Sequence, residues 1–343
     1  MPSPLQGVGV VLPVLAAPMA GDPGTRALVG AAASVGSLGF LAAGYKTAEA
    51  LATNIAAVRS SVSTFGVNLF APNSLPVDGD DFRRYRQAIR VEADRYGIDL
   101  GAGEPLDDDD QWRAKVDLLV ADPVPVVSFT FGLPEPAVVT ALRAAGTLVV
   151  QTVTSVDEAV AAAASGADVL AVQASAAGGH SGTLTPGIRP PSVALTELVA
   201  AVRNAVSLPI IAAGGLATAD DVAAVVHAGA DAVMVGTALL RTDEAGTVPA
   251  HRAALADPAA RGTVVTRAFT GRFARSLRND FIDRYDAIAP AGYPAIHHLT
   301  TPLRKAAAAA GDAERLHLWA GTGYRSAADG PAGTVLAGLA ERL

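Results

Sequence analysis

The chain has 343 residues, of which 50% are hydrophobic and 17% charged, and its formal net charge at pH 7 is −7. This length allows one large domain or two ordinary ones, with a sizeable buried core. The negative charge argues against a nucleic-acid-binding surface. Because the sequence contains no cysteine, disulfides, thiolate nucleophiles and iron–sulfur clusters are excluded, and any redox chemistry needs a cofactor.

The apolar stretch Val8–Ala17 near the N-terminus does not read as a membrane or export signal. No Lys or Arg precedes Arg26, so the basic region that opens a signal peptide is missing. Pro13 and Pro18 interrupt the run, which is also far too short to span a bilayer. We therefore expect a soluble, cytoplasmic protein that binds neither membranes nor nucleic acids.

Eight apolar strand candidates follow one another along the chain, each with a helical pattern behind it. They are Pro13–Ala17, Leu38–Ala42, Phe65–Leu69, Val124–Phe129, Thr147–Thr152, Asp168–Gln173, Leu208–Ala213 and Asp231–Thr237. Continuous apolar runs indicate strands covered on both faces, as in a parallel sheet. Eight such units predict a closed (β/α)8 barrel of the α/β class. A doubly wound open sheet competes with it, but no Gly-x-Gly-x-x-Gly turn follows the first strand.

A partial internal repeat supports the barrel. Capping-box patterns occur at Ser155-x-x-Glu158 and at Thr218-x-x-Asp221, both at predicted helix starts. Each leads through an Ala/Val-rich helix to a Gly-Ala-Asp turn and a further apolar strand. Any two βα units share some of these features, but the equal spacing of all of them favours repeated barrel architecture.

Two segments exceed the minimal barrel. Residues 78–122 are rich in Arg and Asp and predict a solvated helical excursion after the third strand. Residues 243–311 are too long for a connection, and long insertions over a barrel mouth are usually functional; we expect a helical lid here, with the pair His297-His298 on its surface. The predicted divisions are therefore a barrel over 1–242, a lid over 243–311 and a C-terminal segment over 312–343 that packs back on the barrel.

The most informative stretch is the glycine-rich loop after the sixth strand. The apolar run Val169–Val172 ends at the polar Gln173, and His180 follows beside Gly178 and Gly179. Glycine N–H groups can lie against a flat or anionic ligand, and histidine exchanges protons near neutral pH. Barrel active sites lie at the carboxyl ends of the strands. His180 is therefore the catalytic candidate, with a structural histidine as the alternative.

The other predicted strand ends carry amides, hydroxyls and glycines rather than charges. This set suits a neutral heteroaromatic ring better than a metal, and no His, Asp and Glu cluster has ligand spacing. After the seventh and eighth strands, Gly214-Gly215 and Gly236-Thr237 each precede a predicted helix. Glycines at these two positions commonly form a barrel phosphate site. Tight turns without a ligand are the alternative reading.

Taken together and in order, these motifs resemble the nitronate monooxygenases, formerly called 2-nitropropane dioxygenases, which are FMN-dependent barrels. The barrel motifs are Ala16-Ala-Pro-Met19, Gly66-Val-Asn-Leu-Phe70, Val127-Ser-Phe-Thr-Phe-Gly132, Ala177-Gly-Gly-His180, Ala212-Ala-Gly-Gly215 and Gly236-Thr-Ala238. In the second half of the chain, Arg267–Asn279, Tyr293-Pro294, Thr301-Pro-Leu-Arg304 and Leu318-Trp-Ala-Gly321 look like that family's first class. The resemblance covers nearly the whole chain.

The resemblance implies an FMN cofactor, no metal, and oxidation of a small-molecule nitronate by O2 to a carbonyl compound and nitrite. It places His180 over the flavin as the proton-transfer residue, which would act as general base on neutral nitroalkanes, and Tyr293 or Arg272 would steady the substrate from the lid. The implied cofactor contacts are Met19, Asn68, Gln173, Gly178, Gly179, Gly214, Gly215, Met234, Gly236 and Thr237.

Three positions depart from the family pattern, and two other reactions stay open. Ala176, Ser181 and Met234 stand where the family usually has glutamate, arginine and glutamine, so polar partners near the cofactor are lost. The Ala-Gly-Gly-His motif also occurs in related flavin enoyl reductases, so one rival is an NAD(P)H-dependent reductase of quinones or an enoyl thioester. The other is a phosphate-binding barrel lyase or isomerase. The oligomeric state, a homodimer included, also stays open.

Overall fold

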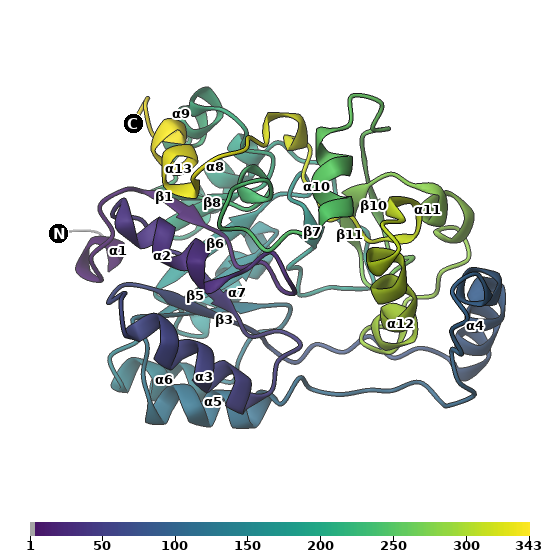
Figure 1. The fold of residues 1–343 in the computed structure, drawn as a ribbon. Coiled ribbons are helices and arrows are strands. Elements are labelled where there is room, and N and C mark those ends of the chain that lie inside the picture. The colour runs from purple at the N-terminus through teal and green to yellow at the C-terminus, as the bar shows by residue number, and fades with distance from the viewer. Residues whose placement is uncertain (1–3) are drawn as a thin grey trace.

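The computed structural model describes residues 4–343 and shows a barrel with a smaller lid beside it (Figure 1). Eight parallel strands follow the order β1-β9-β8-β6-β5-β4-β3-β2, and a parallel bridge from Ala16 to Gly39 joins the two end strands. The predicted (β/α)8 barrel is confirmed. Its strands are β1 (Val14–Ala16), β2 (Phe40–Ala42), β3 (Gly66–Phe70), β4 (Val126–Thr130), β5 (Leu148–Val153), β6 (Val169–Gln173), β8 (Ile210–Ala213) and β9 (Ala232–Val235).

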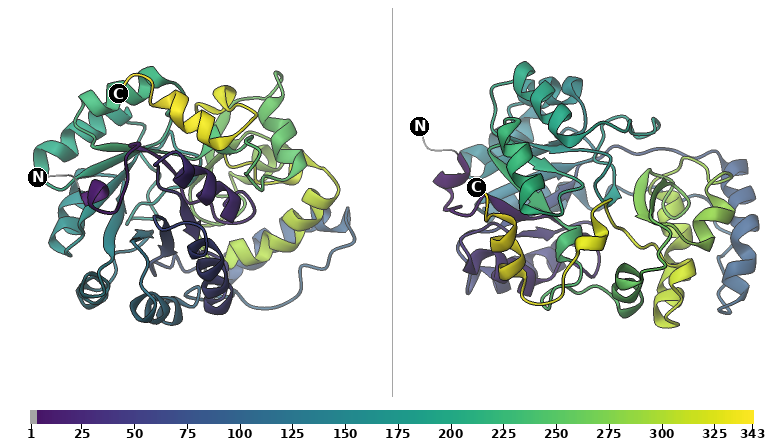
Figure 2. Two further views of the ribbon diagram at one scale, coloured as in Figure 1. Left: turned by 60° about the vertical axis from the view of Figure 1, so that its left-hand side comes forward. Right: turned by 90° about the horizontal axis from the view of Figure 1, so that it is seen from above.

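Helices surround the strands on the outside of the barrel (Figure 2). They are α2 (Arg26–Ser34), α3 (Ala48–Arg59), α5 (Trp112–Ala121), α6 (Pro136–Ala144), α7 (Val156–Ala164), α8 (Leu195–Ala205), α9 (Ala219–His227) and the C-terminal α13 (Ala332–Leu339). The short α1 (Pro4–Gly7) places Leu5 against side chains from the barrel interior. No helix among residues 4–343 combines the length and hydrophobicity needed to cross a bilayer.

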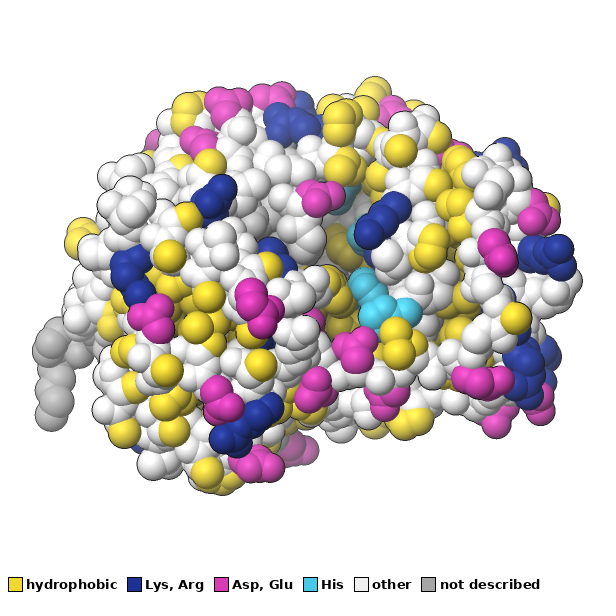
Figure 3. Space-filling view, turned by 60° about the horizontal axis from the view of Figure 1, so that its bottom comes forward, with side chains coloured by type: hydrophobic (Ala, Val, Ile, Leu, Met, Phe, Trp, Pro, Cys, Tyr) yellow, Lys and Arg dark blue, Asp and Glu magenta, His cyan; other side chains and the backbone are white. Residues whose placement is uncertain are grey.

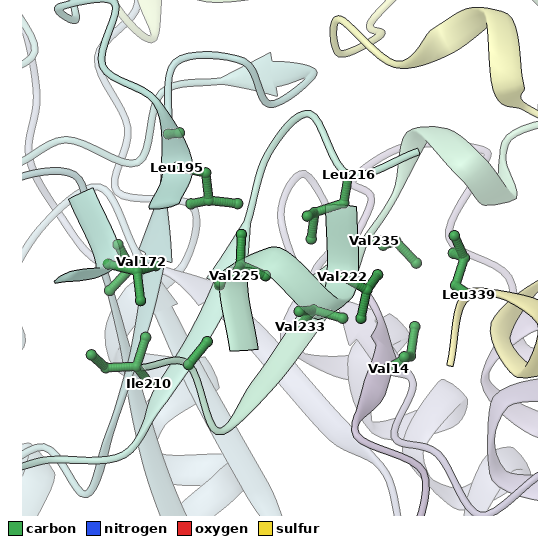
Figure 4. Packing of buried hydrophobic residues seen from close by; sticks show 14 of the residues in the cluster. Val14, Val172, Leu195, Ile210, Leu216, Val222, Val225, Val233, Val235 and Leu339 are labelled. Carbon is green, nitrogen blue, oxygen red and sulfur yellow. The ribbon is translucent and has the colours of Figure 1, made fainter. Parts of the chain in front are cut away.

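The strands bury both of their faces, which explains their uninterrupted apolar runs. On β6, Leu170 and Val172 pack outward into the layer between strands and helices, while Val169 and Ala171 pack into the barrel interior. Figure 4 shows the outward layer, with Val172, Ile210 and Val233 among other apolar side chains. The barrel core therefore has two layers, one inside the barrel and one between the strands and the helices. Full burial of one such side chain contributes about 1.5–3 kcal/mol to the stability of the fold.

The two capping patterns have different outcomes. At α9, Thr218 and Asp221 form the complete reciprocal box. At α7, Ser155 accepts from the Glu158 amide, but the Glu158 carboxylate does not return to the cap residue. It binds the N–H and hydroxyl of Thr154 and reaches the segment after β6 instead. The capping box predicted at Ser155 is therefore only half formed. The Glu158 carboxylate does not accept from the Ser155 N–H, because it binds Thr154 and Thr183 instead.

The lid is a second, smaller core at the carboxyl ends of the strands. It contains β10 (Thr263–Thr266), β11 (Ala274–Leu277), α11 (Asp280–Tyr285) and α12 (Ala295–Ala309), and α10 (Pro249–Ala256) leads into it. The 3-10 turn η2 (Ala313–Arg315) packs against α11 and α12. The lid thus draws on residues on both sides of the predicted boundary at 311.

The helix α4 (Gly79–Asp94) also belongs to the lid, although it follows β3 in the chain. Two long connections carry it away from the barrel (Figure 1). Its Phe82 and Tyr85 are buried with Phe269 and Phe281 of the lid. The prediction of a solvated excursion is therefore wrong for this helix, because the charged residues of 78–95 other than Glu92 lie on its outer face.

A two-residue strand joins barrel and lid at the loop that carries the catalytic candidate. This strand, β7 (Gly179–His180), pairs antiparallel with β11 at Arg275 and Ala274, and β11 pairs with β10. The backbone at His180 is consequently part of the lid sheet, although the loop begins at the end of the barrel strand β6.

A buried carboxylate ties α4 to the rest of the lid. Glu92 is 1% exposed, and its oxygens accept from Arg315 Nε at 3.1 Å and Tyr285 Oη at 3.0 Å. Burial alone would raise the pKa of Glu92, but the hydrogen bonds from Arg315 and Tyr285 outweigh it and the pKa is lowered. The charged form is therefore the one that the folded lid stabilises.

We predict that Glu92→Gln destabilises the protein, because the buried Arg315 loses its closest carboxylate and keeps only the longer contacts with Asp280 at 3.9 Å and Asp312 at 3.8 Å. Removing one member of a buried pair costs on the order of 3 kcal/mol. Glu104→Gln, which breaks the exposed pair with Arg83, should cost less than about 1 kcal/mol. Urea unfolding of both variants measures the two costs, and equal small losses would contradict the role given to Glu92.

Candidate active site

A cavity of about 1150 Å³ lies between the carboxyl ends of the barrel strands and the lid. Figure 3 shows it as a hollow between the two parts, with histidine side chains on its wall. With one exception, the site residues predicted from the sequence line this cavity. Those on its wall are Met19, Asn68, Gln173, Gly178, Gly179, His180, Gly214, Gly215, Met234, Gly236, Thr237 and Tyr293; the exception is Arg272.

At one end, glycines from three segments form a close-packed cradle. A Cβ on Gly178 would lie 2.6 Å from the Gly321 nitrogen, and one on Gly321 would lie 2.7 Å from the Ala176 carbonyl oxygen. Gly214 and Gly215 have φ values of +114° and +79°, which favour glycine. Within residues 4–343, the amide N–H groups of Gly215 and Thr237 donate to no protein acceptor. Free amides at turns of this kind suit a phosphate.

The barrel floor of the cavity offers neutral polar groups. The Asn68 amide nitrogen donates to Ser128 Oγ at 2.9 Å and to Thr130 Oγ1 at 3.0 Å, so its orientation is fixed from below. Gln173 donates to the His180 carbonyl at 3.3 Å and accepts from the Gly182 amide at 2.7 Å. Gln173 therefore shapes the loop that carries His180. A flat, neutral heteroaromatic ring fits this set of groups better than a metal ion does.

His180 stands at the lid side of the cavity. Its Nε2 lies 2.9 Å from Thr270 Oγ1, and its ring contacts those of Phe131, Tyr293 and Trp319 at centroid distances of 5.7, 5.7 and 5.4 Å. Burial, reinforced by the positive charges of Arg272 and Arg304, lowers its pKa to about 3. The imidazole is therefore neutral at pH 7, with one of its two ring nitrogens unprotonated.

Arg272 lies behind the cavity wall rather than on it. The side chain is 1% exposed, its Nη2 donates to the Thr183 carbonyl at 2.6 Å, and its Nη1 donates to the Asn73 carbonyl at 3.3 Å. The guanidinium lies 3.9 Å from the centre of the Phe131 ring. With its donors used on backbone carbonyls, Arg272 braces the wall and acts on the cavity through its charge.

The far wall is an aromatic stack that the sequence reading missed in part. The rings of Tyr45 and His297 are stacked at 4.1 Å and 8°, and the Tyr293 hydroxyl donates to the Tyr45 hydroxyl at 3.3 Å. The surface position predicted for the histidine pair is wrong for His297, which is 8% exposed and lines the cavity. His298 is half-buried and also lines the cavity, and its Nε2 lies 2.5 Å from Asp108 Oδ2.

A buried guanidinium beside this stack was also not predicted as a site residue. Arg304 lines the cavity, is 7% exposed, and donates to the His297 carbonyl at 2.9 Å and to Thr301 Oγ1 at 2.8 Å. No carboxylate among residues 4–343 lies within 4.0 Å of its nitrogens. Burial lowers the pKa of Arg304 to about 10, so it stays charged at pH 7. The motif Thr301-Pro-Leu-Arg304 was the available signal, but the motif alone does not assign a role.

The site thus combines a phosphate-type cradle, a neutral polar floor, an uncharged imidazole and two buried guanidinium groups bound to carbonyl and hydroxyl groups. A neutral imidazole in an apolar, partly closed cavity can remove a proton from carbon. Positive charge without a carboxylate partner stabilises an anion formed there. A ligand with a phosphate at one end and a flat ring at the other matches the chemistry of the residues that line the cavity.

Comparison with known proteins gives a consistent result. The family model described as nitronate monooxygenase matches residues 3–341. A probable nitronate monooxygenase of Staphylococcus aureus (strain Newman) is 34% identical over 353 residues, covering 98% of this chain and 96% of that protein. The crystal structure of a nitroalkane oxidase from Streptomyces ansochromogenes has a TM-score of 0.91 and 45% identity, covering 98% of this chain and 96% of that one.

A more distant structure shares the fold alone. FabK from Thermotoga maritima has a TM-score of 0.73 at 24% identity, over 100% of this chain and 96% of that chain. At this level of identity, the likeness supports the barrel-and-lid architecture and says nothing about the reaction.

The buried histidines predict how stability depends on pH. Burial lowers the pKa of His251 to about 4, against about 6.5 when unfolded. Between these values only the unfolded chain takes up the proton, so stability is complete above pH 6.5 and is lost as the pH falls toward 4. For this one group the loss at pH 5 is about 2 kcal/mol.

We therefore expect His251→Gln to lose less stability than the unsubstituted protein when the pH drops from 7.5 to 5, measured by urea unfolding. Its Nε2 has no hydrogen-bond partner in the folded protein, and glutamine supplies a polar group for the contact that the ring makes with the Trp319 backbone. His227→Gln on the exposed face of α9 is the matched control and should follow the unsubstituted protein. The same pH dependence in all three would contradict the burial argument.

Proposed function

Since the chain belongs to the nitronate monooxygenase family of oxidoreductases, we propose that it uses FMN and O2 to oxidise alkyl nitronates to a carbonyl compound and nitrite. We extend the proposal to neutral nitroalkanes. The observation that carries it is the presence in one cavity of a phosphate-type glycine cradle and the neutral imidazole of His180.

The residues present fit FMN. The cradle around Gly178, Gly215 and Thr237 would take the phosphate, and Asn68 and Gln173 would meet the edge of the ring. Met19 and Met234 add apolar contact, since both line the same cavity. When bound, FMN supplies the electron acceptor and the place where O2 is consumed.

The substrate class follows from charge. Arg304 on the wall and Arg272 behind it stay protonated, and each is bound to backbone carbonyls rather than carboxylates. Their positive potential favours an anionic nitronate over a neutral molecule in the cavity. The apolar rings of Phe131, Tyr293 and Trp319 around His180 exclude water and suit a short alkyl chain.

For a neutral nitroalkane, the chain must first form the anion. His180 accepts the α-proton from carbon, since its imidazole is held uncharged by burial. The charge of Arg304 stabilises the nitronate that results. Tyr293 keeps its proton because burial raises its pKa well above the usual value, so its hydroxyl, which donates to Tyr45, adds no negative charge beside the anion.

The departures from the family pattern are compatible with this assignment. Ala176 and Ser181 hold their loop through the backbone: the Ala176 carbonyl accepts from the Thr322 amide at 3.0 Å, and the Ser181 amide donates to the Phe273 carbonyl at 2.9 Å. The loop therefore keeps its place without the glutamate and arginine side chains. Met234 substitutes an apolar contact for an amide at the cavity floor.

We predict that His180→Asn lowers turnover of a neutral nitroalkane by about 10²–10⁴-fold, because a general base is lost. Turnover of the preformed nitronate should fall far less, since that substrate needs no proton removal. Steady-state rates with nitroethane and with ethylnitronate give the two numbers. Equal losses on both substrates would remove His180 from the role of base.

We also predict that Gly215→Ala weakens FMN binding at least 10-fold, since its Cβ would lie 3.0 Å from that of Ala176 at a positive φ. Gly262→Ala is the matched control, because its φ of +81° is nearly the same as the +79° of Gly215 while nothing lies within 4 Å. Both substitutions carry similar backbone strain, but only the first alters the cradle. Fluorimetric titration of the apoprotein with FMN measures the difference, and similar affinities would locate the phosphate elsewhere.

A further inference from the structure

A fully buried threonine contacts the candidate base. Thr270 lies between β10 and β11 and is 0% exposed. Its Oγ1 is 2.9 Å from His180 Nε2 and 3.2 Å from the Arg272 carbonyl oxygen, to which it donates. The Arg272 amide also approaches this oxygen, at 3.4 Å. The Thr270 hydroxyl therefore contacts three groups: the Arg272 carbonyl, the Arg272 N–H and the His180 imidazole.

The hydroxyl has a single proton, and this limits how the three contacts can be satisfied. If the proton points to the Arg272 carbonyl, the contact with His180 requires an N–H on Nε2, with the hydroxyl oxygen as acceptor. If the proton points to Nε2 instead, the buried carbonyl loses its donor, which is unfavourable. The first arrangement satisfies the carbonyl, the hydroxyl and Nε2.

We propose that Thr270 is a positioning residue that holds neutral His180 in the tautomer with its proton on Nε2 and its lone pair on Nδ1. The proposal rests on the proposed function of His180 as a base. In that tautomer, Nδ1 is the atom that accepts the substrate proton.

The surroundings of the ring agree with this assignment. Within residues 4–343, His180 Nδ1 makes no hydrogen bond, yet it is not among the occluded polar atoms that lack a partner. It is therefore open to the cavity that His180 lines. Nε2, in contrast, is occupied by the Thr270 hydroxyl at 2.9 Å. The side of the imidazole that can react is the side that this tautomer leaves unprotonated.

The backbone that holds Thr270 is itself fixed. The next residue, Gly271, has a φ of +75°, and a Cβ there would lie 2.7 Å from Gly292. Arg272 then donates to the Thr183 carbonyl at 2.6 Å, and the Thr183 hydroxyl donates to Glu158 at 2.7 Å. This chain of contacts reaches from the lid to the barrel helix α7, so the Arg272 carbonyl cannot turn away from Thr270 at low cost.

The tautomer is read directly by ¹⁵N NMR of the holoenzyme with ¹⁵N-labelled histidine, in which His180→Asn identifies the signals of His180. We expect Nε2 of the unsubstituted protein to carry the proton at pH 7.5. Thr270→Val, which keeps the shape and removes the hydroxyl, should give a mixture of tautomers, and Thr270→Ser should restore the Nε2–H form. A proton on Nδ1 in the unsubstituted protein, or an unchanged spectrum in Thr270→Val, would overturn the proposal.

Kinetics supply the second readout. Thr270→Val should lower kcat/KM for nitroethane by about 10–100-fold, less than loss of the base itself. Its kcat/KM for ethylnitronate should stay within about threefold, since no proton is removed there, and Thr270→Ser should restore the nitroethane value. Parallel losses on both substrates would show a merely structural role. If His180→Asn affected both substrates equally, the base role would fail, while the NMR result would still decide the tautomer.

Discussion

The pairing of β7 with β11 is the constraint on which the site depends. Gly179 and His180 leave the barrel at the end of β6, yet their backbone pairs with Arg275 and Ala274 of the lid. The imidazole is consequently held over the mouth by a sheet rather than by a free loop. Because β7 carries His180 on the cavity wall and is paired with β11 of the lid, the positions of the lid and the base cannot change independently.

Burial of charge without carboxylates gives the cavity its chemical character. Arg272 and Arg304 are nine-tenths buried or more, and both are bound to carbonyls and hydroxyls. Such groups solvate a guanidinium without cancelling its charge. The same environment keeps His180 uncharged, since burial and these two cations lower its pKa. A neutral base and an anion-stabilising field therefore arise from one arrangement of side chains.

Much of this could be predicted from the sequence. Continuous apolar runs located all eight strands, since both faces of each strand are buried, and glycines at strand ends located the cavity. The place of α4 in the lid was missed because its many charges obscured Phe82, Tyr85 and Ile89, whose spacing marks one buried helix face. The burial of His297 and the position of Arg272 behind the cavity wall depend on which elements pack together. A local sequence pattern does not predict such packing.

Whether this chain is an FMN-dependent enzyme that oxidises nitronates is decided by the absorption spectrum of the purified protein. The spectrum is recorded before and after anaerobic addition of a nitronate and, separately, of NADH. We expect flavin bands that bleach on addition of the nitronate and persist with NADH. A colourless protein that does not take up FMN, or a flavin that is reduced by NADH alone, would contradict it.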